Sequence, residues 1–161
     1  MISPETLRRY PYFAGINEEC LRSVALLAEK NSFKQGEVIF TESGEFLASD
    51  RIYQEGEKAR HLMLITEGEI DIALTFSAEK QVVVGTLGAG DLMALSALIP
   101  PYLLTSSAIA STDGEMICIE SEELRTLMDD NPELGYHIMS GVAKALRDRL
   151  QNTRIELSGS G

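Results

Sequence analysis

Cysteine, histidine and tryptophan are scarce in this sequence. Its 161 residues include two cysteines, two histidines and no tryptophan. Cys20 and Cys118 are too few for a disulfide framework or a four-cysteine iron–sulfur cluster, so we expect both to be reduced structural residues. His61 and His137 do not form a cluster with cysteines or carboxylates at metal-ligand spacing. We therefore predict neither a metal site nor a cofactor.

Long apolar runs and basic residues are also in short supply. No stretch of about 18 apolar residues could span a membrane, and the first residues lack the apolar segment of a signal peptide. The 14 lysines and arginines are outnumbered by 25 acidic residues, which gives a net charge of −11. Because DNA affinity depends on basic residues that displace counterions, we predict no direct nucleic acid binding. A cytoplasmic protein with an acidic, soluble surface and no membrane partner is expected.

Residue patterns typical of catalytic sites are also missing from the sequence. No serine or cysteine has a histidine at motif spacing. Asp91 and Glu115 are isolated, so they do not form a carboxylate pair for acid–base work. We predict that the protein is not an enzyme.

Two short helices are predicted near the start of the chain. Ser3 offers a capping hydroxyl and is followed by a proline and an acid, so a helix begins there and ends by Pro11. A second helix begins at Asn17. Apolar residues at three- and four-residue intervals extend it over Glu18 to Lys30.

Short apolar or alternating runs broken by glycine follow, and they predict an antiparallel, mainly β domain. The predicted strands are Glu37 to Phe40, Arg51 to Gln54, Leu62 to Thr66, Glu69 to Thr75, Gln81 to Thr86 and Met116 to Glu120. A turn at Gly68 joins two of them, and a polar tip from Ser77 to Lys80 predicts a hairpin.

The sequence nearly repeats itself between Phe40 and Arg60. Residues 39–45 are echoed by residues 52–57, with one residue lost. We interpret the repeat as a duplicated strand and turn that forms an inserted hairpin over residues 43–55. A surface hairpin without chemistry and a partner-binding feature both fit this pattern.

The C-terminal part predicts two more helices, the first capped at Ser121 and the second beginning at Asn131-Pro132-Glu133. Extended to Glu156, the second would measure roughly 36 Å, more than a small β domain needs as cover. Its apolar stripe either pairs two chains in a homodimer, which we favour, or folds back on its own domain. The residues of this seam would be Leu134, Ile138, Val142, Leu146 and Leu150. Residues 158–161 have the composition of a flexible tail.

Residues at fixed places along the chain carry a family resemblance. They are Leu7, Pro11, Phe13, Gly15, Ile16, Phe33, residues 36–40, residues 56–59, Leu62, Leu64, Ile65, residues 67–69, residues 88–91 and residues 121–124. In this order and spacing they resemble the cyclic-nucleotide-binding domain of catabolite-activator-like regulators. The resemblance implies one domain over residues 1–161, with a jelly-roll-like double-sheet β roll (33–120) between N-terminal helices (1–30) and C-terminal helices (121–157). Such regulators continue into a helix-turn-helix domain, whereas we expect a stand-alone sensor here.

The phosphate cassette of that family reads approximately Phe-Gly-Glu-x-Ala-Leu-Leu, then a loop, then Arg-x-Ala followed by Thr or Ser. Its helix N–H groups face the phosphate, its glutamate accepts the ribose hydroxyl and its arginine neutralises the phosphate. The matching residues are Met93 to Ile99 and Leu104 to Ser107, which put Leu95 at the glutamate position and Leu104 at the arginine position. No lysine or arginine occurs from Gly85 to Cys118. Because a charge-assisted contact is worth about 1.5–3 kcal/mol, we expect cyclic AMP and cyclic GMP to bind weakly or not at all.

A pocket without those charges would suit a neutral or weakly polar small molecule. Its predicted lining is Met93, Ala94, Leu95, Ser96, Ala97, Leu98, Tyr102, Leu104, Thr105, Ser106 and Ser107. Alternatively, the leucines close the space as core, or Arg60, the last helix or a second subunit supplies the missing charge. The leading hypothesis is a dimeric, non-catalytic sensor that responds to a small-molecule effector or a protein partner. A structural or protein-interaction domain comes second, and a cupin-type enzyme, which needs more histidines around a metal, comes third.

Overall fold

The computed structural model describes residues 1–36, 51–53, 56–77 and 80–160. Two short helices open the chain, α1 (Pro4–Arg8) and α2 (Glu18–Leu26). The Ser3 side chain accepts a hydrogen bond from the Glu5 N–H at 3.3 Å, and the Asn17 side chain accepts one from the Cys20 N–H at 2.9 Å. Both predicted helix starts are confirmed.

The second helix ends earlier than the sequence predicts. α2 stops at Leu26 and strand β1 (Ala28–Phe33) follows, so the prediction of helix up to Lys30 is wrong, and the N-terminal helical segment is shorter than 1–30. Strand pairing is the reason. β1 lies antiparallel to β8 (Gly114–Glu120), with Ala28 opposite Ile119. This long-range pairing outweighs the local helical periodicity.

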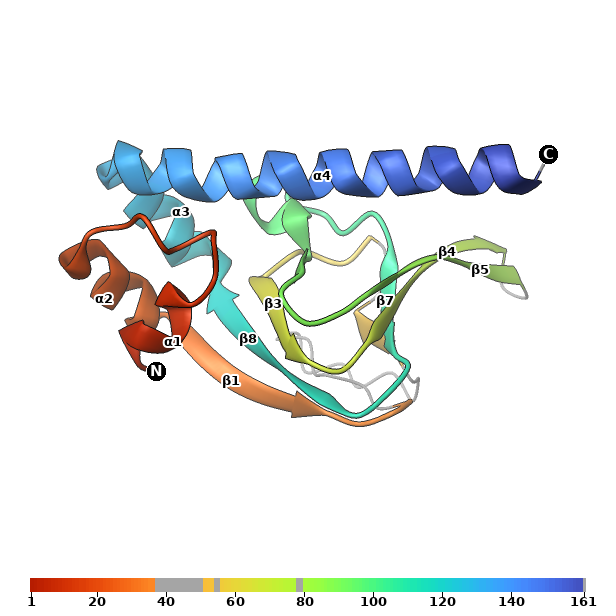
Figure 1. Cartoon of the computed structure of the whole chain (residues 1–161), viewed down its shortest axis with the longest axis horizontal. Coiled ribbons are helices and arrows are strands. Elements are labelled where there is room, and N and C mark those ends of the chain that lie inside the picture. Colours follow the sequence, from red (N-terminus) through yellow and green to blue (C-terminus); the bar gives the residue numbers. More distant parts are fainter. Residues whose placement is uncertain (37–50, 54–55, 78–79, 161) are drawn as a thin grey trace.

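The described residues form two four-stranded antiparallel sheets, which make up a β roll (Figure 1). Their strand orders are β1-β8-β3-β6 and β2-β7-β4-β5. The other strands are β2 (Arg51–Tyr53), β3 (His61–Glu67), β4 (Ile70–Ser77), β5 (Lys80–Leu87), β6 (Leu92–Met93) and β7 (Ser107–Ala110). The predicted mainly β, double-sheet architecture with a long C-terminal helix is confirmed.

Each predicted strand that falls within the described residues is present, with bounds shifted by a few residues. The β4–β5 hairpin turns where the polar tip is predicted, with Ser77 opposite Lys80. β6 and β7 are not expected from the sequence, because one has two residues and the other is built mostly of small ones. The predicted strand Glu37 to Phe40 and most of the inserted hairpin lie outside the described residues.

Two helices follow the roll, α3 (Ser121–Asp130) and α4 (Pro132–Ser160). The cap of α3 is Glu120 rather than the predicted Ser121. The Glu120 carboxylate accepts hydrogen bonds from the N–H groups of Glu122 and Glu123 at 3.1 and 2.6 Å. The Ser121 hydroxyl instead donates to the Ala59 carbonyl at 3.0 Å, which ties the start of α3 to the residues that precede β3.

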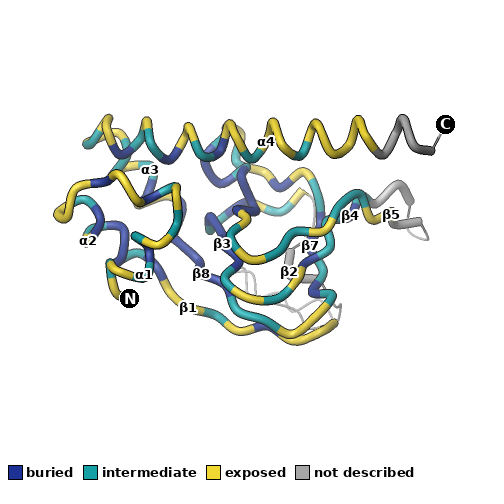
Figure 2. Tube along the Cα trace, viewed as in Figure 1, coloured by how far each residue is buried: buried dark blue, intermediate teal, exposed yellow. Residues whose placement is uncertain are grey.

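α4 runs along one flank of the β roll (Figure 1), and burial along it is concentrated in its N-terminal half (Figure 2). Leu134, Ile138 and Val142 are each 1% exposed and belong to the core of their own chain. Leu146 and Leu150 are 44% and 51% exposed. The predicted dimer seam is therefore wrong for its first three residues. The helix also includes residues 158–160, where the sequence predicts a flexible tail.

Candidate functional site

The cassette positions form a tight link between β6 and β7. Ala94, at the place of the family's glycine, has a left-handed backbone with φ 58°. One turn of 3₁₀ helix, η1 (Leu95–Leu98), follows it. A cis bond joins Pro100 to Pro101, and Tyr102 has φ 64°. The helical turn expected of a cassette is thus present, although Ala94 adopts a conformation that costs a residue with a Cβ atom roughly 1 kcal/mol.

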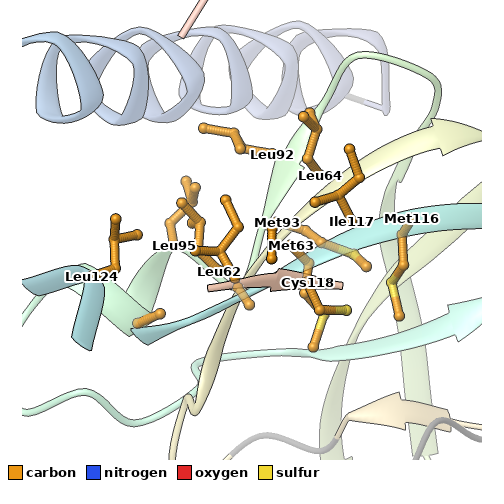
Figure 3. Packing of buried hydrophobic residues seen from close by; sticks show 14 of the residues in the cluster. Leu62, Met63, Leu64, Leu92, Met93, Leu95, Met116, Ile117, Cys118 and Leu124 are labelled. Carbon is orange, nitrogen blue, oxygen red and sulfur yellow. The ribbon is translucent and has the colours of Figure 1, made fainter. Parts of the chain in front are cut away.

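The two leucines at the charged positions of the cassette are buried. Leu95 is 5% exposed and Leu104 is 6% exposed. Figure 3 shows Leu95 within the cluster of buried hydrophobic side chains, which also includes Leu62 and Met93. The apolar cassette residues predicted to line a pocket all belong to this core: Met93, Ala94, Leu95, Ala97, Leu98 and Leu104. This is the arrangement expected if the leucines fill the space that a ligand occupies in the family.

The polar cassette residues do not form one continuous surface. Ser107 is fully buried, Ser106 is half-buried and Thr105 is exposed. Ser96 and Tyr102 are half-buried. The hydroxyls of residues 105–107 are therefore split between the interior and the solvent.

Backbone hydrogen bonds hold the segment before β7 against residues 56–59. The Leu104 carbonyl accepts from the Gly56 N–H at 2.7 Å, and the Leu104 N–H donates to the Glu57 carbonyl at 2.8 Å. The Ala59 N–H donates to the Tyr102 carbonyl, also at 2.8 Å. The backbone at Leu104 is therefore fixed on both sides. A longer side chain at position 104 would enter the core in the same direction as the Leu104 side chain does.

Arg125 of α3 contacts the far end of the cassette, and nothing in the sequence motif points to it. Its Nη1 atom donates to the Ala97 carbonyl at 2.6 Å, and its guanidinium carbon lies 3.9 Å from the centroid of the Tyr102 ring. Carbonyl groups at the end of a helical turn lack partners within it, so a cation there is favourable. The aromatic face adds a cation–π contact. Arg125 thus clamps η1 to the loop that leads to β7.

Arg149 of α4 reaches the opposite end, where the chain enters the cassette. Its Nη2 atom donates to the carbonyl of Leu92 in β6. Nearby, the Tyr12 hydroxyl donates to the Gly90 carbonyl at 2.9 Å. Burial raises the pKa of this phenol above its ordinary value, and the negative charge of Asp91 adds to the effect. Arg149 belongs to the last helix, which is one of the three predicted sources of a replacement charge.

Two clefts between α4 and the β roll share Arg149 as a lining residue. The larger has a volume of about 610 Å³ and lies against Tyr12, the β5–β6 loop and the charged flank of α4. The smaller has a volume of about 370 Å³. Its lining residues are Ile72, Val84, Gly85, Thr86, Leu87, Arg149, Asn152, Thr153 and Ile155. The cassette residues predicted as pocket lining do not contribute to either cleft.

Cysteines, histidines and acidic residues form no metal centre in the described part of the chain, where no group of three or more such side chains is placed to hold an ion. Cys20 is half-buried and Cys118 is buried, both as free thiols. Among the described residues, no helix has the length and apolar character needed to cross a membrane.

The chain is similar to known proteins in both sequence and fold. The sequence profile described as the cyclic nucleotide-binding domain matches residues 43–131, more than half of the chain. A solved structure described as a cyclic nucleotide-binding protein of Geobacter metallireducens is 35% identical and has a TM-score of 0.74, over 93% of this chain and 99% of that one. A cyclic nucleotide-binding domain of Methylobacillus flagellatus shares the fold at 16% identity, with a TM-score of 0.73 over 98% of this chain and 81% of that one.

Longer regulators match as well. The CRP-like cAMP-activated global transcriptional regulator of Mycobacterium tuberculosis is 22% identical over 153 residues, which cover 95% of this chain and 62% of that protein. The chain therefore spans less than two thirds of the length of this relative. Cyclic nucleotide-binding domains and CRP-like regulators are sensors and regulators rather than enzymes. The profile match and the similarity to the Geobacter structure together show that the chain belongs to the cyclic nucleotide-binding domain family.

Proposed function

We propose that this chain is a non-catalytic sensor or regulatory module that binds cyclic AMP and cyclic GMP weakly or not at all. One observation supports the proposal most directly. The positions at which the family places its ligand-binding glutamate and arginine hold leucines, Leu95 and Leu104, and both are buried in the core.

Two physical terms oppose cyclic-nucleotide binding at this cassette. The N–H groups of η1 provide dipoles but no full positive charge, and burying an uncompensated phosphate costs several kcal/mol. Room for the ligand would also require Leu95 and Leu104 to leave their packed positions, at about 1.5–3 kcal/mol for each exposed side chain. A ligand of another chemistry, bound elsewhere between the roll and α4, avoids both costs.

A second candidate is a true cyclic-nucleotide binder whose cation comes from α4. The position of Arg149 supports it, because this guanidinium already contacts Leu92 at the entrance to the cassette. In that case wild-type protein would bind cyclic AMP, and Arg149→Gln would abolish the binding. Arg147→Gln is the matched control, because the Arg147 side chain is 71% exposed and lines neither cleft.

We further propose that α4 pairs two copies of the chain. Tyr136, Met139, Ala143, Leu146 and Leu150 alternate at three- and four-residue intervals, which is the a and d spacing of a coiled coil. All five are exposed in the single chain, Tyr136 at 73%. This set replaces the seam predicted from the sequence and keeps two of its members. An isologous helix pair would remove the stripe from water.

The remaining alternative is a structural or protein-interaction domain that has no ligand, and thermal-shift measurements separate it from a sensor. The protein would be screened against cyclic AMP, cyclic GMP and a panel of small metabolites. A ligand present at 100 times its Kd stabilises the folded state by about 2.7 kcal/mol, which raises Tm by several degrees. A panel in which no compound raises Tm would support the interaction domain.

A further inference from the structure

The larger cleft follows α4 from His137 to Asn152, a distance of about four helical turns. Its volume of about 610 Å³ lies in the middle of the range of roughly 300–1,000 Å³ found for small-molecule sites. Pro11 and Leu87 across from the helix, with Ala145 on it, give the lining an apolar part. The cleft can therefore accept a small molecule that combines polar groups with an apolar side chain.

The charged residues that line this cleft in the described part of the chain balance one another. Asp91 and Asp148 are negative, whereas Lys144 and Arg149 are positive. Arg149 is not open to a ligand, because its guanidinium donates to the Leu92 carbonyl and the residue has a further interaction within the protein. Its charge offsets that of one of the two carboxylates. The surroundings of Arg149 therefore keep one negative charge, and Lys144 supplies one positive charge.

The Tyr12 hydroxyl marks the anionic part of the cleft. Burial has the largest effect on the pKa of this phenol and raises it, and the negative charges of Asp91 and Asp148 raise it further. The charge of Arg149 acts in the opposite direction. Because the effect of one charge on another group falls with distance, both carboxylates lie near this hydroxyl.

Both carboxylates can still accept hydrogen bonds from a ligand. One oxygen of Asp91 accepts from the Gly88 N–H at 2.9 Å. Asp148 contacts Arg147 at 3.7 Å in a largely exposed pair, a type of contact that contributes little. Since an ionised carboxylate has about four acceptor positions, these contacts leave room for an ammonium group.

Lys144 provides the cationic part of the cleft, one turn before Asp148 and about 6 Å from it along the helix axis. A lysine that precedes an acid at this spacing is the weaker orientation of a helical ion pair. The Lys144 ammonium indeed forms no ion pair with any residue that the structure describes. His137 and Ser140 precede it in the lining and can donate hydrogen bonds to an anion. Opposite charges thus lie next to each other in the cleft without neutralising each other by direct contact.

We propose that the larger cleft binds a zwitterion of the α-amino acid class that has an apolar side chain. The ligand carboxylate pairs with Lys144, its ammonium group lies between Asp91 and Asp148, and its side chain packs against Leu87. A ligand with a single charge would leave one side of the cleft desolvated and unpaired, which is unfavourable. This inference rests on the proposed sensor function, because it names the ligand class to which the sensor responds.

Calorimetric titration of the full chain with L-leucine tests the proposal. L-leucinamide, which lacks the carboxylate, and N-acetyl-L-leucine, which lacks the ammonium group, are its singly charged counterparts. Leucine should show saturable binding at one site per subunit. Each counterpart should bind about five- to tenfold more weakly, which is the value of one partly exposed charged contact.

Two variants assign each ligand charge to its partner. Lys144→Gln should weaken leucine about five- to tenfold but should not weaken leucinamide, which has no carboxylate for the lysine. Asp148→Asn should weaken leucine to a similar extent but should not weaken N-acetylleucine. Lys144 and Asp148 are both exposed, so the variants should fold. Arg154→Gln and Glu133→Gln remove charges of the same signs from exposed positions of α4 outside the cleft, and they should leave all three titrations unchanged.

Three results would each overturn the inference: no saturable binding of leucine at millimolar concentration, a singly charged counterpart that binds as tightly as leucine, or full affinity for leucine in Lys144→Gln. Cyclic AMP titrated in parallel reports separately on the proposed function. Tight binding of cyclic AMP would contradict that function, whereas failure of leucine alone would contradict only the ligand class.

Discussion

The guanidinium carbon of Arg125 lies 3.9 Å from the centroid of the Tyr102 ring. The two residues come from α3 and from the loop before β7, and the same guanidinium donates to the Ala97 carbonyl at 2.6 Å. Tyr102 holds a left-handed backbone with φ 64°, which is uncommon for a bulky residue. One arginine thus secures both the end of η1 and the loop that positions Leu104.

Arg125→Ala should lower the free energy of unfolding by roughly 1.5–3 kcal/mol, because a charged hydrogen bond and a cation–π contact are lost together. Arg125→Lys should recover part of the loss, since lysine keeps the charge but lacks the planar group. Urea denaturation measures both variants. Arg22→Ala is the control, because its 3.7 Å ion pair with Glu18 is exposed and should contribute less than about 0.5 kcal/mol. Similar losses at positions 22 and 125 would contradict the clamp.

Gly141 of α4 packs against the Tyr12 ring so closely that a Cβ atom at this position would overlap the ring. Gly141→Ala should therefore destabilise the protein by about 1–3 kcal/mol, although alanine is favoured over glycine in a helix by about 1 kcal/mol. In a Tyr12→Ala background the same substitution should be neutral or stabilising, because the ring is gone. A double-mutant cycle from urea denaturation measures this difference. Additive effects would show that Tyr12 and Gly141 are not coupled.

Burial raises the pKa of the Cys118 thiol from its ordinary value of 9.0 to about 11. The folded protein therefore holds this proton more tightly than the unfolded chain does. The resulting stabilisation is fully present below pH 9.0 and is lost as the pH rises toward about 11. Between these values, unfolding free energies of wild-type protein should fall more steeply with pH than those of Cys118→Ala, by at most about 1.4 kcal/mol per pH unit. Parallel slopes for the two proteins would rule out the thiol as the cause.

Leu146→Glu combined with Leu150→Glu should convert a wild-type dimer into a folded monomer, because the two charges repel across the proposed helix pair. Sedimentation velocity at micromolar concentration measures the change. Lys144→Glu, on the flank of α4 that lines the larger cleft, should leave the dimer intact. Val142→Glu should instead unfold the protein, since Val142 is 1% exposed within its own chain. A monomeric wild-type protein would rule out the seam.

Local signals made part of the fold predictable. Capping by Ser3 and Asn17 depends on a few neighbouring residues, and both helix starts are where the sequence predicts them. The end of α2 depends instead on β8, which lies far along the chain and pairs with the residues from Ala28 onward. The apolar stripe of α4 shows a related limit. Periodicity identifies Val142 and Leu146 as apolar positions, but only packing shows that one is core and the other is exposed.

The candidate site is also only partly predictable from the sequence. Leu95 and Leu104 could be found by matching a motif, since their identities and spacing are written in the sequence. Arg125 and Arg149 could not, because they reach the cassette from 28 and 57 residues away. Their contacts are to backbone carbonyls, which leave no sequence signature at the accepting position. Only the folded arrangement of α3, α4 and β6 brings these charges to the two ends of the cassette.

The most direct test of the account is calorimetric titration of cyclic AMP and cyclic GMP into wild-type protein and into the double variant Leu95→Glu, Leu104→Arg. A swapped variant, Leu95→Arg with Leu104→Glu, introduces the same charges at exchanged positions and serves as the control. Wild-type and swapped proteins should show no saturable binding at micromolar ligand, whereas the double variant should gain it, because the retained cassette backbone would then have both charged contacts. Micromolar binding of either nucleotide by wild-type protein would contradict the claim that Leu95 and Leu104 have removed phosphate recognition.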